Sequence, residues 1–358
     1  MPANDAIQTF ITGIGAISPI GCEIPQILEN ILQKRDGIRR ATKIDTSPFL
    51  SKLCAEFDFD YSQELSEAEM SEFRDPYLRL AISASRRALR DAGLKKSAGK
   101  NIAIVAATCN AGTNSQQIEY RNLFGDHSEP FTAQSSLESE LYAATKALAR
   151  ALGLGGEIYL INTACSGSTA ALGFAQTLIE SGEYEAVLAG GADALSLVNF
   201  AGFSAIKVVS EEKTAPFSTP TGLNIGEGAA FWVLENSLAA KARGAKVYGK
   251  IAAHSTSSDA FHPTQPDPRG DGVFRTLQAA LDYAQIPLEK IACINAHASG
   301  TLANDKAEAK GVLKFLNGKK IPITSSKSYN GHCMGATGIL EATVQLVSML
   351  NGFLPPTL

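Results

Sequence analysis

Cys165 is the residue best placed to act as a nucleophile in this chain of 358 residues. It lies between an apolar run at 157–164, which predicts a buried strand, and small and apolar residues that predict a helix ending near Gly182. A helix N-terminus favours a thiolate over a thiol, and its backbone N–H groups stabilise an oxyanion. The pattern therefore predicts a strand-to-helix elbow with a nucleophilic thiol. The alternative is a small buried cysteine at a tight turn.

Two of the five histidines lie in segments rich in glycine and other small residues. His297 ends a predicted strand and precedes Ala-Ser-Gly-Thr, and His332 lies between Lys327 and a long apolar helix. A thiol and two imidazoles suit acyl transfer followed by attack of a carbon nucleophile, because imidazoles can donate hydrogen bonds to a thioester carbonyl as it gains negative charge. The alternative for His297 is a hydrogen-bonded histidine at a strand end, and the alternative for Lys327 is a surface lysine beside a structural glycine turn.

No metal site is predicted at these residues. Cys333 directly follows His332, and adjacent residues make poor ligand geometry. The six cysteines show neither a Cys-x-x-Cys pair nor zinc spacing, and they favour reduced thiols in a cytoplasm.

Strands and helices alternate along the chain, which predicts an α/β fold with a parallel sheet. The predicted strands are 7–15, 101–108, 157–164, 186–194, 229–235, 247–255, 291–297 and 321–325. The predicted helices are 24–34, 75–92, 137–152, 166–182, 237–244, 272–284, 305–316 and 337–351. Ligand sites lie at the carboxyl ends of strands in such sheets, so we expect Cys165, His297, Lys327 and His332 to meet.

Local residue types give three further predictions. The region 109–135 is rich in Asn, Gly, Thr and Ser and is predicted to be a surface loop. Gly13, Gly15 and Gly21 are predicted to form turns, since the full dinucleotide-binding pattern is absent. Asp305 is predicted to cap the helix that follows it.

The composition is that of an ordinary globular chain, with 45% hydrophobic residues, 19% charged residues and a formal net charge of −4. This charge gives no electrostatic case for binding nucleic acid. No apolar run reaches membrane-spanning length, and the start, MPANDAIQTF, lacks the basic and apolar regions of a signal peptide. A cytoplasmic protein that binds neither nucleic acid nor membrane is predicted.

Three motifs together resemble the elongating β-ketoacyl-acyl carrier protein synthases (ketosynthases) of the thiolase superfamily. They are TACSG at Cys165, NAH…GT…DKAEA from Asn295, and SSKS..GH..GA.G from Ser325. They occur in family order, with supporting segments from the first strand to Thr357. The resemblance implies a thiolase-like α/β fold, with two similar βα halves in a layered α-β-α-β-α arrangement. The halves are predicted at 1–240, with the nucleophile, and 241–358, with the histidines.

The resemblance also implies the roles of the catalytic residues. Cys165 is the implied acyl acceptor, while His297 and His332 are implied to promote malonyl decarboxylation and to stabilise the enolate. Lys327 is implied to orient this network, with Glu308 as its carboxylate partner.

The implied reaction is a decarboxylative Claisen condensation of an acyl thioester on Cys165 with malonyl-acyl carrier protein, which gives 3-oxoacyl-acyl carrier protein. Ser299 and Thr301 fall where the family places hydroxyls on the phosphopantetheine arm. The arm arrives on the carrier protein, so no resident metal or redox cofactor is implied.

Two departures from the family bear on substrate and partner. The family's PFD..RDG segment reads PFSTPTG from Pro216, and the helix before Asp75 is acidic where it is often basic. Carrier docking is therefore expected at other basic residues, namely Arg39, Arg40, Lys43 or Lys207. The departures favour polyene or type II polyketide synthesis over housekeeping fatty acid synthesis.

Two rival functions differ from a ketosynthase in their catalytic residues. A thiolase would use a second catalytic cysteine, whereas this chain has two histidines and Lys327. A chain-length-factor-like subunit of a heterodimer would typically lack the nucleophile, but Cys165 is present. An active or structural subunit of such a heterodimer stays open.

The resemblance implies a homodimer, or a heterodimer with a related subunit, that forms through the strand at 186–194. That strand is almost uncharged, so an exposed edge there would favour a partner. Family members usually continue beyond the PPT motif with a glycine-rich loop that completes the oxyanion hole. This chain stops at Leu358, so it is expected to be part of a longer natural protein.

Overall fold

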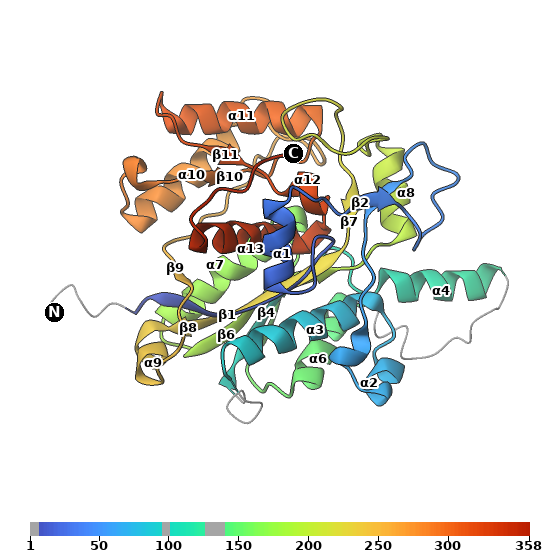
Figure 1. Ribbon diagram of the computed structural model, residues 1–358, viewed down its shortest axis with the longest axis horizontal. Coiled ribbons are helices and arrows are strands. Elements are labelled where there is room, and N and C mark those ends of the chain that lie inside the picture. Colours follow the sequence, from blue (N-terminus) through green and yellow to red (C-terminus); the bar gives the residue numbers. More distant parts are fainter. Residues whose placement is uncertain (1–6, 95–100, 126–139) are drawn as a thin grey trace.

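The computed structural model describes residues 7–94, 101–125 and 140–358. Figure 1 shows five layers: a helical layer at the top, a small sheet, a central helical layer, a large sheet and a lower helical layer. The helices of these layers are α10 (Asp271–Ala284) and α11 (Leu302–Leu316), α7 (Gly167–Glu180) and α13 (Thr337–Leu350), and α3 (Pro76–Asp91) and α6 (Leu141–Leu152). This α-β-α-β-α order confirms the predicted thiolase-like arrangement.

The large sheet has the strand order β5-β4-β6-β8-β1-β9. Its strands are β1 (Thr9–Ile17), β4 (Ala103–Ala107), β5 (Ile158–Ile161), β6 (Ala186–Asp193), β8 (Gly228–Asn236) and β9 (Gly249–Ile251). β4 runs parallel to β5 and β6, whereas β8 is antiparallel to β6 and β1, and β9 is antiparallel to β1. The prediction of a parallel sheet is therefore wrong for β8 and β9. The helix between β6 and β8 in the chain is α8 (Leu197–Ala205). It lies beyond the end of β6 and does not return the chain along the sheet, as a helix that connects two parallel strands would.

β6 lies in the interior of this sheet, between β4 and β8. The expectation that the strand at 186–194 is an exposed edge is therefore wrong. The edge on that side is β5, whose four residues are all half-buried and uncharged. An uncharged run does not distinguish an interior strand from an edge strand.

Two glycines predicted to form turns instead lie within β1. A Cβ atom would come 2.3 Å from the Ala88 carbonyl oxygen at Gly13 and 2.0 Å from that of Ala84 at Gly15. Both glycines therefore let α3 pack directly on the strand. The prediction is confirmed for Gly21, which forms a tight turn with Ser18.

The predicted loop at 109–135 is wrong in part, because α4 occupies Thr113–Phe124. The residues Gln-Gln-Ile-Glu-Tyr within it include good helix formers, which the polar composition of the surrounding segment obscured. Residues 126–135 lie outside the described ranges, as do residues 137–139 of the next predicted helix. That helix, α6, begins after Glu140, whose carboxylate accepts hydrogen bonds from the Tyr142 and Ala143 N–H groups.

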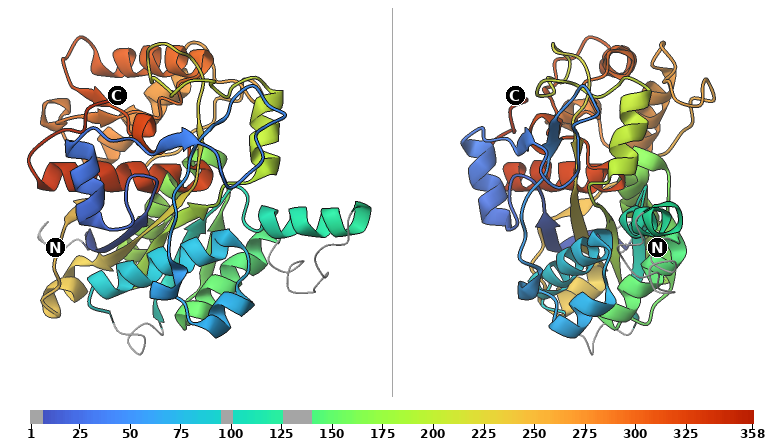
Figure 2. Two further views of the ribbon diagram at one scale, coloured as in Figure 1. Left: turned by 45° about the vertical axis from the view of Figure 1, so that its right-hand side comes forward. Right: turned by 90° about the vertical axis from the view of Figure 1, so that its right-hand side faces the viewer.

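The rest of the described chain forms two smaller sheets and several shorter helices. A three-stranded sheet contains β2 (Ile38–Arg40), β3 (Leu53–Ala55) and β7 (Ile225–Gly226), and a parallel pair contains β10 (Ile294–Asn295) and β11 (Ile323–Thr324). The remaining helices are α1 (Ile24–Leu32), α2 (Glu67–Glu72), α9 (Ser237–Ala242) and α12 (Lys327–Asn330). Figure 2 shows α1 and α8 on opposite flanks of α13. Among the described residues, no helix is long and apolar enough to cross a membrane.

The N-termini of α7 and α13 meet in the central layer. A Cβ atom at Gly338 would lie 2.1 Å from Thr169 Oγ1. The Ile339 N–H donates a 3.0 Å hydrogen bond to Ser168 Oγ. This close approach brings the segment that precedes α13, which contains His332, next to the segment that precedes α7, which contains Cys165.

Candidate active site

Cys165 lies at a sharp junction between β5 and α7. Cys165 is the middle residue of a single 3-10 turn, Ala164–Ser166, which leads directly into the helix that begins at Gly167. Ala164 has a φ of +52°, a left-handed conformation that is uncommon for a residue with a Cβ atom. The predicted strand-to-helix elbow is therefore present, and its backbone is strained at the residue before the thiol.

The structure brings together the thiol and both histidines. Cys165 Sγ and one ring nitrogen each of His297 and His332 all lie within 4.8 Å of one another. The two imidazole rings are edge-to-face, with centroids 5.5 Å apart and an interplanar angle of 89°. His297 follows β10 and His332 precedes α13, so the site collects residues from both halves of the chain.

Lys327 lies beside His297 and contacts both its ring and its backbone. Its buried Nζ is 3.2 Å from His297 Nδ1, donates to the His297 carbonyl oxygen, and lies 2.6 Å from Glu341 Oε1. The carboxylate partner of Lys327 is therefore Glu341, and the assignment of Glu308 to that place is wrong. Glu341 is buried on α13 at a position that the motifs do not include.

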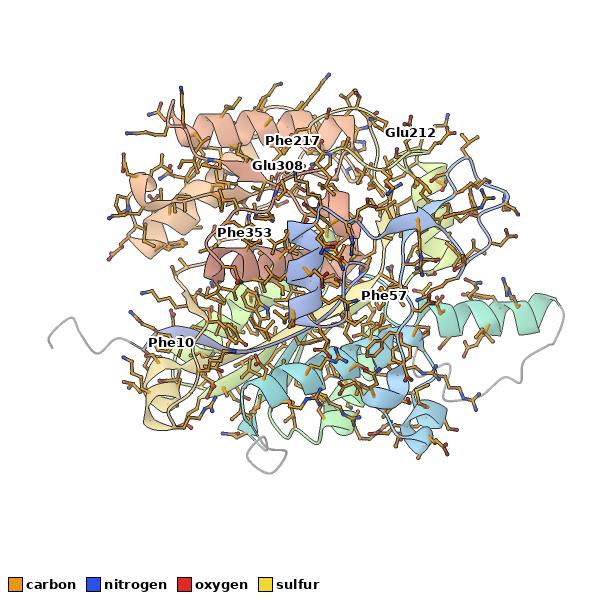
Figure 3. All side chains as sticks on the ribbon, viewed as in Figure 1. Phe10, Phe57, Glu212, Phe217, Glu308 and Phe353 are labelled. Carbon is orange, nitrogen blue, oxygen red and sulfur yellow. The ribbon has the colours of Figure 1, made fainter. Side chains whose placement is uncertain are left out.

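Glu308 instead holds the backbone of the His297 segment. Its two carboxylate oxygens accept 2.6 Å hydrogen bonds from the N–H groups of His297 and Ala298. It projects from the first half of α11, in the upper part of Figure 3, near Phe217. The motifs that carry the resemblance include Glu308 but do not show whether its carboxylate pairs with the lysine or binds the adjoining backbone.

The loop after His297 packs tightly against the loop at residues 214–222. A Cβ atom at Gly300 would lie 2.3 Å from Thr214 Oγ1. Ser299 Oγ and Thr301 Oγ1, the two predicted pantetheine contacts, are 3.0 Å apart and hydrogen-bonded to each other. Asp305 is not the N-cap of α11, because Thr301 occupies that position. Asp305 accepts hydrogen bonds from the Gly300 and Phe217 N–H groups, at 3.1 and 2.7 Å, and so joins the two loops.

Hydrogen bonds define the proton position on each imidazole. His332 Nδ1 accepts a 3.2 Å hydrogen bond from the Met334 N–H. His297 Nδ1 faces the Lys327 ammonium group, which can donate hydrogen bonds but cannot accept them. We therefore assign the ring proton of both neutral histidines to Nε2. Nδ1 of each ring is already in contact with its partner, so Nε2–H is the group that each ring can donate to a substrate.

Burial keeps both imidazoles uncharged. Burial and the Lys327 charge lower the pKa of His332 to about 3. Burial, Lys327 and His332 lower the pKa of His297 well below its ordinary value. Both rings are therefore neutral at physiological pH.

The thiol does not follow the expectation of a favoured thiolate. Burial raises the pKa of Cys165 above its ordinary value, and the Lys327 charge opposes this shift without reversing it. Desolvation of the thiolate thus outweighs the favourable position before a helix. Cys165 is a protonated thiol in the resting protein.

Two buried carboxylates near the site were missed. Glu341 is the single acidic residue of α13, and Asp193 ends the otherwise apolar β6. An acidic group within an apolar element is the signal that indicates such residues. The thiol and two imidazoles also form a donor set that suits a soft or borderline cation, and the prediction of no metal stays a prediction.

Comparison with known proteins agrees with this geometry. The model of the β-ketoacyl synthase N-terminal domain matches residues 8–240, and that of the C-terminal domain matches residues 248–358. The 3-oxoacyl-[acyl-carrier-protein] synthase 2 of Staphylococcus aureus (strain MRSA252) is 32% identical over 367 residues, which cover 98% of this chain and 88% of that protein. The chain therefore belongs to the β-ketoacyl synthase family.

Solved structures give the same assignment. The ishigamide ketosynthase/chain length factor superposes with a TM-score of 0.92 at 29% identity, covering 98% of this chain and 88% of that chain. A type II PKS acyl-carrier protein in complex with its ketosynthase bound to the hexaketide superposes with a TM-score of 0.88 at 26% identity, covering 99% and 89%. Within the thiolase superfamily, the resemblance to β-ketoacyl-acyl carrier protein synthases is confirmed.

Proposed function

We propose that this chain condenses an acyl group held on Cys165 with malonyl-acyl carrier protein, releasing CO2 and 3-oxoacyl-acyl carrier protein. One observation carries the proposal: a thiol and two neutral imidazoles lie within 4.8 Å of one another. A neutral imidazole N–H is a hydrogen-bond donor that suits a carbonyl oxygen as it gains charge. The arrangement therefore suits a reaction with one acyl acceptor and one enolate.

The first step is transfer of the acyl group. Cys165 Sγ attacks the acyl thioester carbonyl, the C–S bond to the pantetheine sulfur breaks, and the Cys165 proton ends on the departing thiol. Because burial raises the pKa of Cys165, this proton is still on sulfur when the acyl donor binds. The product is a thioester on Cys165 and a free pantetheine thiol.

The second step is decarboxylation and carbon–carbon bond formation. The malonyl thioester carbonyl accepts hydrogen bonds from Nε2–H of His297 and His332 while its carboxylate leaves as CO2. The enolate carbon attacks the acyl carbon on Cys165, and the Cys165 thiolate leaves and takes a proton from solvent. The histidines keep their protons throughout, so they act as donors and not as bases.

Three further side chains support these steps. Lys327 holds the His297 ring through Nδ1, and Glu341 balances the buried ammonium charge. Ser299 and Thr301 would bind the phosphopantetheine arm, which the carrier protein supplies, so the reaction requires no resident cofactor. The substrate would belong to fatty acid synthesis, or to polyene or type II polyketide synthesis, which the departures at Pro216 favour.

The carrier protein is proposed to bind near α8. Of the basic residues considered for docking, Arg39 pairs with Asp58 and Lys43 with Glu227. Arg40 and Lys207 are exposed at the surface and are the better candidates for contact with an acidic carrier.

A second copy of this chain, or a related subunit, is proposed to cover β5. The residues Asn162–Ala164, which connect β5 to Cys165, are exposed beside this uncharged edge. An edge of this kind is a template for pairing with another chain. Such an assembly is named for a structural relative, the ishigamide ketosynthase/chain length factor. A cytoplasmic location suits the six free cysteines.

Intact-mass measurement with an acyl-carrier protein tests the proposal. We expect the wild-type chain to gain one acyl mass and Cys165→Ala to gain none, while Cys109→Ala, which removes a neighbouring thiol, still loads. Release of labelled CO2 from malonyl-carrier protein measures the second step. Loading on a residue other than Cys165, or condensation by Cys165→Ala, would refute it.

A further inference from the structure

We propose that Asp193 is a positioning residue for the decarboxylation step, because it anchors the turn that fixes the proton on His332. This inference rests on the proposed function for its effect on rate, but its structural part concerns only the His332 tautomer. Asp193 is the last residue of β6, and no motif of the resemblance includes it.

Asp193 joins two segments that are distant in the sequence. Its carboxylate is fully buried and accepts four hydrogen bonds. Oδ1 accepts from Thr108 Oγ1 at 2.6 Å and from the Asn110 N–H at 3.1 Å. Oδ2 accepts from the Cys109 N–H at 2.9 Å and from the Gly335 N–H at 2.7 Å. One side chain thus ties the segment after β4 to the turn before α13.

The contact with Gly335 leads directly to His332. Gly335 lies in the 3-10 turn at Met334–Ala336, and the preceding N–H, that of Met334, donates to His332 Nδ1. This donor is what keeps Nδ1 unprotonated and places the ring proton on Nε2. If the turn moved away, the Nε2–H tautomer would lose this stabilising hydrogen bond, and the Nδ1–H tautomer would become populated. In that tautomer Nε2 carries no proton and cannot donate to the malonyl carbonyl.

The surrounding backbone leaves the turn little space to adjust. A Cβ atom at Gly335 would lie 2.8 Å from Thr108 Cα and 2.9 Å from Asp193 Oδ2. A Cβ atom at Gly191 would lie 2.9 Å from the Gly335 carbonyl oxygen. Gly191 and Gly335 therefore allow the turn before α13 to approach β6 closely, and the Asp193 carboxylate holds the turn in that position.

Only a carboxylate satisfies all four donors, because each of its oxygens accepts two of them. In Asp193→Asn, one oxygen becomes an NH2 group that faces two donors and can accept from neither. An NH2 group in place of Oδ1 disrupts the bonds from Thr108 and Asn110, both in the segment after β4. An NH2 group in place of Oδ2 disrupts the bonds from Cys109 and from Gly335. A buried donor left without an acceptor is costly, so the turn is expected to shift.

The experiment compares Asp193→Asn with Asp91→Asn. Asp91 is a control at an exposed position outside the site, where its carboxylate accepts hydrogen bonds from the Ile14 N–H at 2.9 Å and from Tyr248 OH at 2.7 Å. Nitrogen-15 NMR of the histidines reports the tautomer, and His332→Gln identifies the His332 signals. Acyl loading and CO2 release are measured separately.

In the wild type and Asp91→Asn we expect His332 to carry its proton on Nε2, with both rates unchanged. In Asp193→Asn we expect a population with the proton on Nδ1 and CO2 release lowered by about 10- to 100-fold, less than the loss of about 10²–10³ when an oxyanion donor is removed outright. Acyl loading is expected to fall far less than CO2 release, because the four hydrogen bonds of Asp193 come from segments other than the Cys165 turn. Loss of the Asp193 charge also removes one cause that raises the pKa of Cys165.

A second variant covers the case in which Asp193→Asn does not fold. Gly335→Ala keeps every charged group and pushes the turn away from Asp193 Oδ2, so it is expected to give the same tautomer change and the same loss of CO2 release. An unchanged tautomer in the folded variant, or equal losses in loading and CO2 release, would overturn the proposal. A wild type that neither loads nor decarboxylates would instead refute the proposed function, and the tautomer measurement would still decide the role of Asp193.

Discussion

Glu341 Oε1 lies 2.6 Å from Lys327 Nζ, and both side chains are buried. Lys327 also contacts the ring nitrogen and the carbonyl oxygen of His297. Lys327 thus places a positive charge next to one active-site imidazole, and the Glu341 carboxylate compensates that charge. A buried charge of this kind is tolerated only while its partner is present.

Removal of Glu341 alone is therefore expected to be strongly destabilising. In Glu341→Gln the Lys327 ammonium loses its counter-charge, and we expect the free energy of unfolding to fall by about 3–5 kcal/mol. The double variant Lys327→Met/Glu341→Leu buries no charge and is expected to regain most of that loss, although without decarboxylation activity. Denaturant unfolding of the two variants checks this. Equal destabilisation of both would show that the pair contributes nothing beyond packing.

The two histidines are expected to affect one chemical step only. In His297→Ala and in His332→Ala we expect CO2 release to fall by about 10²–10³, because each removes one hydrogen-bond donor to the malonyl carbonyl. Acyl loading of Cys165, measured by intact mass, is expected to persist in both. Failure of both variants to load would mean that the histidines are bases for the thiol.

Stability is expected to depend on pH through the same histidines. An unfolded histidine binds a proton below its ordinary pKa of about 6.5, whereas His332 in the folded protein has a pKa of about 3. Between these values the unfolded state binds more protons, so the free energy of unfolding falls as the pH decreases. We expect His332→Gln to flatten this slope, and His262→Gln, which changes an exposed histidine, to keep it. Parallel curves for the wild type and His332→Gln would contradict the neutral, buried imidazole.

Alkylation of Cys165 by iodoacetamide is expected to accelerate as the pH rises through 8 and 9. The thiolate is the reacting species, and burial raises the pKa of this thiol. In Lys327→Met the opposing positive charge is gone, so alkylation at a given pH is expected to be slower. Peptide mass spectrometry distinguishes Cys165 from the other cysteines. A rate that levels off by pH 7 would show that the helix N-terminus outweighs desolvation.

The sequence was informative where a residue's chemistry and its local pattern agree. Cys165 at a strand-to-helix junction, and His297 and His332 among small residues, were identified because small residues mark close backbone approach. The layered fold followed from the alternation of elements and from the resemblance. These features depend on segments of a few residues that carry their own signal.

The sequence was less informative about which distant groups pair. Glu308 and Glu341 are both carboxylates on helices near the site, and only the packing of α13 against Lys327 selects Glu341. β5 is uncharged and β6 is apolar up to its last residue, Asp193, so only the sheet order distinguishes the interior strand from the edge strand. The direction of β8 is likewise set by tertiary structure: α8 lies beyond the end of β6, so the chain returns antiparallel to β6. Such choices are set by tertiary contacts, which a local pattern does not encode.

The close approach of Gly338 to Thr169 has a consequence for how this protein melts. α13 also bonds to the large sheet, where Trp232 Nε1 donates a 3.0 Å hydrogen bond to Thr343 Oγ1. Helix α13 of the second half is therefore built into the core of the first, and neither half keeps a complete core if the other unfolds. The halves must lose their structure in one cooperative transition, and a calorimetric scan would show a single heat-absorption peak in which the nucleophile and both histidines are lost together.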